Sequence, residues 1–394
     1  MDDELKYAYL SYTDTLLKLD MATGEVTGSV TGFGPGSFTV EGGAHLGCLA
    51  FYDGRVYGSL EYKSPGKKFF LAVFDPERIS GMSMNFEDME EGVDAVLLHE
   101  PTCDFRDPLD DQPGSEDGSA VNGDPLGHRF GCSGIDGVTF GRLPGDTSGR
   151  IYCLVAYGIY GNRDEWLRRY DNNYNILRVY DPGMFRERFN PITGSGDRVL
   201  RRFTCERGMD MAFEEQEALK AVDTLFVWTG TTDWGCQNLE AERDSGDIVL
   251  HTYRTVKPGW EEWSRKDAVF VIDAAAGCEM KEIEVGQSSL NADPDIRNAA
   301  LKKARCYMED GRFPLGRHVC LKCICDDGCQ VREWADTGHT AMICGAVNEK
   351  ATATFGIASL GNAYYYVAHD QFRMSLHRRD EHFRFTRVAA GELR

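Results

Sequence analysis

The chain has 394 residues, of which 42% are hydrophobic and 27% charged, and its formal net charge is −20. This acidity argues against nucleic acid and anionic lipid as partners, because both are bound through clustered Lys and Arg. No apolar run approaches the ~18 residues of a membrane span, and the first residues, MDDELK, lack the basic and apolar regions of a signal peptide. Most of the 13 cysteines stand singly on predicted strands, so we expect a cytoplasmic protein with reduced thiols.

Two kinds of segment recur along the chain. The first is an apolar run of period two that closes on an aspartate before a Gly- or Pro-rich turn, which is typical of a strand leading into a hairpin. Its copies end at Asp20, Asp75, Asp181 and Asp273. The second is a pair of short apolar strands joined by a turn, with copies that begin at His45, Gly134, Gln237 and Phe355. Joined, the two segments form a four-stranded antiparallel module with strands a, b, c and d.

Five such modules are recognisable, and the irregular stretches leave room for a sixth. The first module, Tyr7 to Val30, shows only strands b, c and d. Repeated four-stranded sheets predict an all-β fold, a β-propeller, because radial packing buries both faces of the blades. We expect a single domain over residues 1–394, with insertions at about 102–129, 205–235 and 290–344.

The insertions are expected on one face of the propeller. The connections from b to c and from d to the next a hold most of the surplus sequence, and in an antiparallel meander both kinds open at the same mouth. Long loops on one side of a rigid scaffold commonly carry function. We therefore expect the site at this mouth, where strands a begin and strands b end.

Polar side chains from several modules are predicted to converge at this mouth. They are Glu61 and His369 at the ends of strands b, and His45, Asp136, Gln237 and Asn238 at the starts of strands a. Carboxylate and amide oxygens suit Ca²⁺, and added imidazoles shift the preference toward Mn²⁺ or Zn²⁺. The predicted metal ligands are Glu61, Asp136, Gln237 and Asn238, with His45 or His369 as general base. Alternatively, the Asp and Asn side chains only cap the strand entries.

The segment IDGVTF, from Ile135 to Phe140, resembles the inner-strand signature of calcium-dependent propeller lactonases and their NHL-repeat relatives, which include gluconolactonase-like and paraoxonase-like proteins. The resemblance implies a calcium ion in the central tunnel, held by Asn or Asp at the starts of inner strands and completed by a Glu. Asp136 matches this motif directly, whereas Asn238 stands where the family has Gly. Glu61 would replace a Glu that the family places on an inner strand, and Phe355–Gly356 lacks the polar residue.

A compact cysteine cluster follows His318. Its members, with spacing C-x2-C-x-C-x3-C, are Cys320, Cys323, Cys325 and Cys329. Four thiolates can bind a structural Zn²⁺, although zinc sites usually separate two C-x2-C pairs by a dozen or more residues. A disulfide-stapled loop and unused thiols are the alternatives. We expect the cluster in an insertion between a strand d and the next strand a, where a metal would shape the functional face.

These features predict a metal-dependent propeller hydrolase of the lactonase or esterase type, acting on a small-molecule or sugar-like ligand. Two alternatives stay open. Gln237 and His369 would also fit a lyase acting on uronic-acid sugars, although a net charge of −20 disfavours polyanions. The third hypothesis is a non-enzymatic platform for a protein partner, which would carry an apolar or aromatic patch over its loops.

Overall fold

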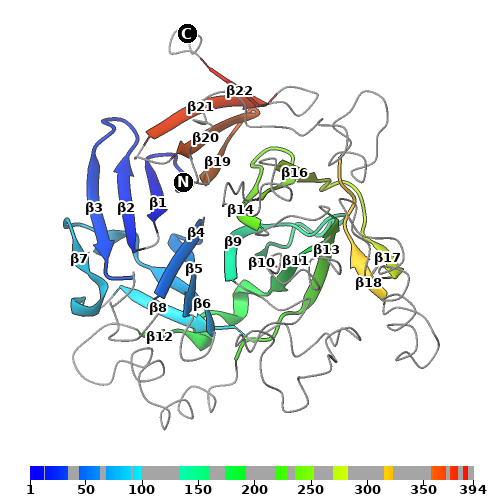
Figure 1. The fold of residues 1–394 in the computed structure, drawn as a ribbon, viewed down its shortest axis with the longest axis horizontal. Helices are drawn as coiled ribbons and strands as arrows, with labels where there is room; N and C mark the ends of the chain where they lie inside the picture. The colour runs from blue at the N-terminus through cyan, green and yellow to red at the C-terminus, as the bar shows by residue number, and fades with distance from the viewer. Residues whose placement is uncertain are drawn as a thin grey trace, which may run out of the picture.

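The repeated modules form five β-sheets arranged in a ring (Figure 1). The structure is a computed structural model, and it describes residues 1–12, 14–33, 44–62, 68–89, 92–98, 134–158, 174–191, 218–228, 236–252, 269–282, 315–322, 356–369, 373–379 and 385–388. The described elements are β-strands and short 3-10 helices. The chain is therefore an all-β, five-bladed β-propeller, which confirms the predicted fold with five blades.

Within each blade the strands follow one another outward from the axis. Blade 1 consists of β1 (Tyr7–Tyr12), β2 (Thr15–Asp20) and β3 (Val26–Thr31). Blade 2 consists of β4 (Ala44–Tyr52), β5 (Arg55–Tyr62), β6 (Lys68–Phe74) and β8 (Val93–Leu97). Blade 3 consists of β9 (Gly134–Gly141), β10 (Tyr152–Gly158), β11 (Tyr174–Tyr180) and β13 (Asp223–Trp228). Blade 4 has β14 (Cys236–Ala241), β15 (Ile248–Thr252) and β16 (Val269–Ile272). Blade 5 has β19 (Gly356–Gly361), β20 (Tyr364–His369), β21 (Arg373–Arg379) and β22 (Phe385–Arg387).

The recurring aspartate ends its strand by the same local bond in each copy. The carboxylates of Asp20, Asp75, Asp181 and Asp273 each accept the backbone N–H two residues on, at 2.8 to 3.0 Å. A short carboxylate can reach its own backbone in this way, which explains why Asp recurs at the turn. The Asp-terminated strand is second in blade 1 and third in blades 2 to 4, so the described residues show no strand a in blade 1, as predicted.

The hairpin prediction is right after Asp20 and wrong after the other three aspartates. A proline follows Asp75 and Asp181, and there the chain enters the 3-10 helices η1 (Pro76–Arg78) and η5 (Pro182–Met184). Proline fixes φ near the helical value and donates no backbone bond, so it suits the first position of such a turn. Two further 3-10 helices lie in the same connections, η2 (Phe86–Asp88) and η6 (Arg186–Arg188).

The connections between third and fourth strands reach across to the preceding blade. β7 (Met84–Asn85), from blade 2, pairs with β3 of blade 1. β12 (Asn190–Pro191), from blade 3, pairs with β8 of blade 2. β18 (Leu315–His318), which follows β16, pairs with β13 of blade 3, and β17 (Glu279–Glu282) pairs with β18 rather than with β16. Each connection thereby covers a sheet edge, which would otherwise expose unpaired backbone groups.

Long connections occur at both mouths of the propeller. Residues 99–133 connect β8 to β9 and so belong to the mouth expected to carry the site. Residues 192–217 and 283–314 lie between third and fourth strands, whose ends open at the opposite mouth. The predicted insertion at 102–129, and most of those at 205–235 and 290–344, lie outside the described residues. The surplus sequence is therefore shared between two mouths, because third-to-fourth connections also serve to cover the neighbouring blade.

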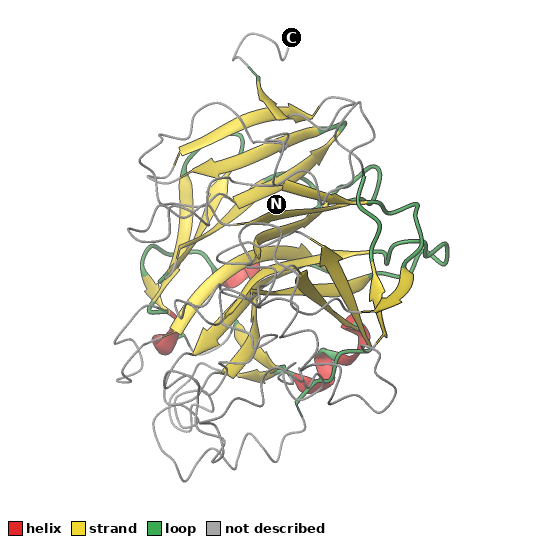
Figure 2. Ribbon diagram, turned by 45° about the vertical axis from the view of Figure 1, so that its right-hand side comes forward, coloured by secondary structure: helices red, strands yellow, loops and turns green. Residues whose placement is uncertain are grey.

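The hydrophobic core fills the spaces between blades. Leu16 and Phe70 belong to a cluster that joins blades 1 and 2. Val73 and Val138 belong to a second cluster, between blades 2 and 3, and a third cluster joins blades 3, 4 and 5. These four side chains are fully buried, and each such burial contributes about 1.5–3 kcal/mol. Blade 2 contributes to the first and second clusters and blade 3 to the second and third, so each buries both faces, as a propeller requires. Figure 2 shows the sheets of the molecule from a second direction.

Candidate functional site

Three of the predicted site residues meet between blades 2 and 3. His45 lies on β4 directly opposite Glu61 on β5, and Asp136 lies on the neighbouring inner strand β9. The Nδ1 atom of His45 is 3.5 Å from Oε1 of Glu61 and 3.5 Å from Oδ1 of Asp136. The backbone N–H of Ile135 donates to Oε2 of Glu61 at 3.2 Å. One imidazole and two carboxylates from two blades therefore converge on a common point.

The burial of this cluster is uneven. The Glu61 and Asp136 side chains are 2% and 1% exposed, whereas the His45 side chain is 22% exposed. Nδ1 of His45 is buried, so the exposed part of this side chain lies away from the two carboxylates. Burying two negative charges together is unfavourable unless a positive charge accompanies them. A positive charge on the His45 ring or on a cation would offset this cost.

A glycine makes the close approach of these strands feasible. A Cβ atom at Gly47 would lie 2.5 Å from Oγ of Ser59 and 3.1 Å from Oδ1 of Asp136. The first distance is shorter than a real Cβ contact and the second is tight, so a side chain at this position would displace Ser59 and crowd the Asp136 carboxylate. The sequence did not identify Gly47 and Ser59 as site residues, because their residue types alone indicate no role. Only the fold places them beside the cluster.

The distances from His45 Nδ1 to the two carboxylate oxygens are slightly longer than those between neighbouring ligands of one cation. A distance of 3.5 Å is longer than an ordinary N–H···O hydrogen bond. Neighbouring ligands of a divalent cation, at bond lengths of about 2.1 Å, stand about 3–3.4 Å apart. As they stand, however, no group of three His, Cys, Asp or Glu side chains in the described ranges qualifies as a metal site. Binding would therefore require the side chains to draw together around the ion.

The amide of Asn238 is engaged elsewhere. Its Nδ2 donates to Sγ of Cys48 on β4 at 3.2 Å, and its Oδ1 accepts the backbone N–H of Ile357 on β19 at 3.4 Å. Asn238 thereby joins inner strands of blades 2, 4 and 5. The register of β14 shifts between Cys236 and Asn238, so Gln237 occupies a bulge, and its side chain lies outside the described part of the structure. The described donors for a cation are therefore Glu61, Asp136 and His45.

His369 is the last residue of β20, opposite Arg373 of β21, and its side chain is not among those described. Its backbone position, at the end of a second strand, is the equivalent of the Glu61 position. The structure thus places both residues at the mouth where second strands end, as the strand alignment predicts, but it gives no contact between His369 and the cluster.

The cysteine cluster begins on the outer edge of blade 4, and not in a connection between two blades as expected. The backbone N–H of Asp273 donates to the carbonyl of Cys320 at 2.9 Å, and Leu321 bridges to Ile272 of β16. The Cys320 thiol is free and donates to the carbonyl of Gly277 at 3.3 Å. Cys323, Cys325 and Cys329 lie outside the described residues, so the zinc prediction remains a prediction.

The thiols near the axis are core residues. Cys48 and Cys236 are free and buried. Burial raises the pKa of the Cys48 thiol to about 11 and raises the pKa of Cys236 as well. Both thiols are therefore protonated near neutral pH, which makes them poor nucleophiles.

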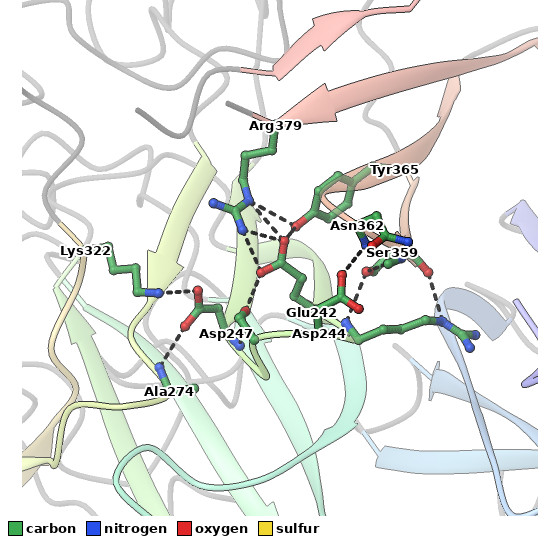
Figure 3. Close-up of polar contacts among 12 residues, drawn as sticks. Glu242, Asp244, Asp247, Ala274, Lys322, Ser359, Asn362, Tyr365 and Arg379 are labelled. Atoms are coloured by element: carbon green, nitrogen blue, oxygen red, sulfur yellow. Dashed lines mark hydrogen bonds and ion pairs between the residues drawn. The ribbon is translucent and has the colours of Figure 1, made fainter. Parts of the chain in front are cut away.

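Two acids of blade 4, Glu240 and Glu242, were given no role from the sequence. Oε1 of Glu240 accepts the backbone N–H of Ser359 on β19 at 2.8 Å, and burial raises the pKa of its carboxyl group. Glu242, in the turn after β14, binds Arg379 and Tyr365 of blade 5 (Figure 3). Arg379 is 137 residues away from Glu242 in the chain, so no local pattern could have paired them. These acids join blades 4 and 5.

Fold and site together define a five-bladed β-propeller with a carboxylate–histidine cluster between its second and third blades. The described residues include no helix both long and apolar enough to cross a membrane. No protein-family model matches the chain, and no curated protein matches it. The propeller fold agrees with the resemblance seen in the sequence, whereas its lactonase type remains a prediction.

Structural comparison matches 29 chains, and the similarities are weak. Hydrazine synthase of Kuenenia stuttgartiensis has a TM-score of 0.28 and 14% identity, over 70% of this chain and 45% of that one. Hsv2 of Kluyvelomyces marxianus has a TM-score of 0.28 and 9% identity, over 97% and 81%. The tail fiber of Staphylococcus aureus phage P68 has a TM-score of 0.25 and 9% identity, over 99% and 71%. The chain spans less than half the length of the hydrazine synthase chain, and none of these similarities bears on function.

Proposed function

We propose that the protein is a metal-dependent hydrolase of lactones or other carboxylic esters, with its site at His45, Glu61 and Asp136. The observation that carries this proposal is the equal 3.5 Å separation of His45 Nδ1 from one oxygen of each carboxylate. Two carboxylates and one imidazole are a common donor set for hydrolytic metal ions. The exposed side of His45 opens the cluster to a small ligand.

The donor set favours manganese or zinc over the calcium that the sequence resemblance implies. Calcium takes six to eight oxygen ligands, whereas the described cluster supplies two carboxylates and a nitrogen, and the amide of Asn238 is bound to Cys48 and Ile357. An imidazole ligand shifts the preference toward transition metals and zinc. When bound, such an ion would polarise the ester carbonyl and acidify a water molecule.

The protein residues have distinct parts in this proposal. Glu61 and Asp136 supply the negative charge, and the backbone N–H of Ile135 fixes one oxygen of Glu61 at 3.2 Å. His45 becomes a third donor through Nδ1 rather than the general base that the sequence suggested, because this nitrogen faces the two carboxylates. His369 remains the candidate base. The lyase alternative depends on Gln237 and His369, so the described side chains lend it no support.

The first test is calorimetric titration of chelator-treated protein with Mn²⁺, Zn²⁺ and Ca²⁺, together with elemental analysis of the untreated protein. We expect about one equivalent of Mn²⁺ or Zn²⁺ to bind, and affinity to fall as the pH is lowered, because metal ligands must be deprotonated. Asp136→Asn and Glu61→Gln should each weaken binding by about 100-fold or more. Asp94→Asn is the matched control, since Asp94 is a half-buried carboxylate on β8, outside the cluster.

Activity is then measured on p-nitrophenyl acetate and on a panel of γ- and δ-lactones, with and without the bound ion. Hydrolysis that needs the ion and is lost in Asp136→Asn supports the whole proposal. Binding of Mn²⁺ or Zn²⁺ without hydrolysis of any ester would support the metal site and refute the hydrolase activity. If no ion binds to the wild-type protein, the metal site is wrong and protonated His45 is the charge that balances the two carboxylates.

A further inference from the structure

The outer edge of blade 5 departs from the pattern that protects the other blades. The outer strands β3, β8 and β13 are each paired with a segment from the next blade around the ring. Such cover needs a long connection between third and fourth strands. Blade 1 follows blade 5 in the ring (Figure 1), but its corresponding connection is only the tight turn at residues 21–25. It is too short to reach the outer strand of blade 5, which is β22.

The backbone of β22 presents hydrogen-bonding groups on its outer side. The N–H of Val388 donates to the carbonyl of Leu376 at 2.8 Å, so the backbone of Val388 faces β21. In an antiparallel pair these groups alternate in direction, so Thr386 also faces β21, opposite Arg378. The N–H and C=O groups of Phe385 and Arg387 therefore point outward, where no described strand pairs with them.

The same edge is basic in an otherwise acidic protein. β21 reads RMSLHRR and β22 reads FTR, so the two strands contain four arginines and no acidic residue, while Asp380 and Glu381 stand between them in the sequence. Arg379 is bound by Glu242, whereas Arg378 is exposed. The net charge of the chain is −20, so this edge contrasts with the chain as a whole.

We propose that β22 is a docking edge for an extended acidic segment of a partner protein. The segment adds to blade 5 as a further strand and bonds to the outward backbone groups of Phe385 and Arg387. Its acidic side chains pair with Arg378, the exposed arginine of β21. This mode takes affinity from main-chain bonds and selectivity from side chains at alternate positions. It is independent of the carboxylate–histidine cluster, which lies between blades 2 and 3.

The test uses a fluorescein-labelled octapeptide of alternating Glu and Val, with binding to the full-length protein followed by fluorescence anisotropy at low salt. We expect saturable binding that weakens as ionic strength rises. Arg387→Pro removes an outward N–H without touching the bonds to β21, and should weaken binding about tenfold or more. Arg387→Glu keeps the backbone and reverses the charge, so it tests the proposal even if the proline variant fails to fold.

Two controls separate edge binding from general electrostatic attraction. Arg142→Glu makes the same charge change at an exposed residue after β9 and should bind the peptide like the wild type. In hydrogen exchange, the N–H of Arg387 should become protected when peptide is added. The proposal is overturned if the octapeptide does not bind, if it binds Arg387→Pro and Arg387→Glu as well as wild type, or if a Lys-Val octapeptide binds equally. A concentration-dependent dimer lost in Arg387→Pro would also overturn it, and would assign the edge to a second copy.

Discussion

Two junctions between blades bury carboxylates, and they treat them in opposite ways. Between blades 4 and 5, Nη2 of Arg379 lies 2.6 and 2.8 Å from the two oxygens of Glu242, and the hydroxyls of Tyr365 and Ser245 also donate to that carboxylate (Figure 3). Between blades 2 and 3, two buried carboxylates share one imidazole at 3.5 Å. In the first junction one acid meets three short donors. In the second, one oxygen of each acid lies 3.5 Å from the same nitrogen of a partly exposed imidazole.

The difference separates a structural contact from a binding site. A buried carboxylate that meets a bidentate guanidinium and two hydroxyls has its charge and lone pairs satisfied, and it holds two blades together. Two carboxylates that converge beside a partly exposed imidazole place negative charge where a cation can enter. Position in the ring agrees with this, because His45 and Glu61 lie at a mouth of the propeller, where first strands begin and second strands end.

The largest expected effect is at the structural junction. Arg379→Met removes the guanidinium and leaves the carboxylate of Glu242, which is 3% exposed, without its main donor. Loss of one partner of a buried pair costs about 3–5 kcal/mol, so the free energy of unfolding in urea should fall by that amount. Arg378→Met is the matched control on the same strand, and because Arg378 is exposed it should change stability by less than about 0.5 kcal/mol. If Arg379→Met and Arg378→Met lower the free energy of unfolding equally, the contrast between the two junctions is wrong.

The repeat and part of the site could be predicted from the sequence, because both depend on local rules. Period-two strands and the Asx turn at Asp20 need only neighbouring residues. The turn at Asp53–Gly54, where both residues have positive φ, starts the register of this hairpin, and an irregularity between Leu46 and Leu49 shifts it by one residue, so that His45 lies opposite Glu61. Asp136 occupies the same kind of position one blade further on.

The rest depends on contacts that no local pattern encodes. β7 and β12 are two residues long, too short to show a period, so their exchange between blades was not predicted. The bulge at Gln237 breaks the alternation of β14, and for this reason the direction of the Asn238 side chain was not predicted either. Two short strands, β17 and β18, lie between β16 and Cys320 in the chain. For this reason the sequence predicts Cys320 in a connection between blades and not beside β16.

The second expected effect is the pH dependence of stability conferred by a buried histidine of blade 4. Burial lowers the pKa of His251 from 6.5 to about 4. Below pH 6.5 the unfolded chain binds a proton at this residue and the folded protein does not, so stability falls as pH drops toward 4, by up to about 3 kcal/mol. Above pH 6.5 both states are neutral and the contribution vanishes. Urea unfolding at several values of pH should show a shallower loss on acidification in His251→Gln than in the wild type, and parallel curves would refute the assignment.

The third expected effect is at Gly47, beside the carboxylate–histidine cluster. Gly47→Ala sets a methyl group 2.5 Å from Ser59 Oγ and 3.1 Å from Asp136 Oδ1, and overpacking of this kind costs about 1–3 kcal/mol. Because Asp136 must move, Mn²⁺ or Zn²⁺ should also bind more weakly. Gly277→Ala is the control, since a Cβ there meets no atom within 4 Å. Loss of stability with unchanged metal affinity would show that the close approach at Gly47 does not position Asp136.

The smallest expected effect on stability is at Glu61, and it tests the comparison of the two junctions most directly. Glu61→Gln keeps the shape of the side chain and an oxygen that can accept the N–H of Ile135, while it removes one of two negative charges that converge on His45. Relief of that repulsion offsets the lost interaction with the ring, so the free energy of unfolding should change by less than about 1 kcal/mol. Metal affinity, in contrast, should fall steeply. A loss of stability as large as that of Arg379→Met would mean that Glu61 holds blades 2 and 3 together as Glu242 holds blades 4 and 5, and that both carboxylates are structural.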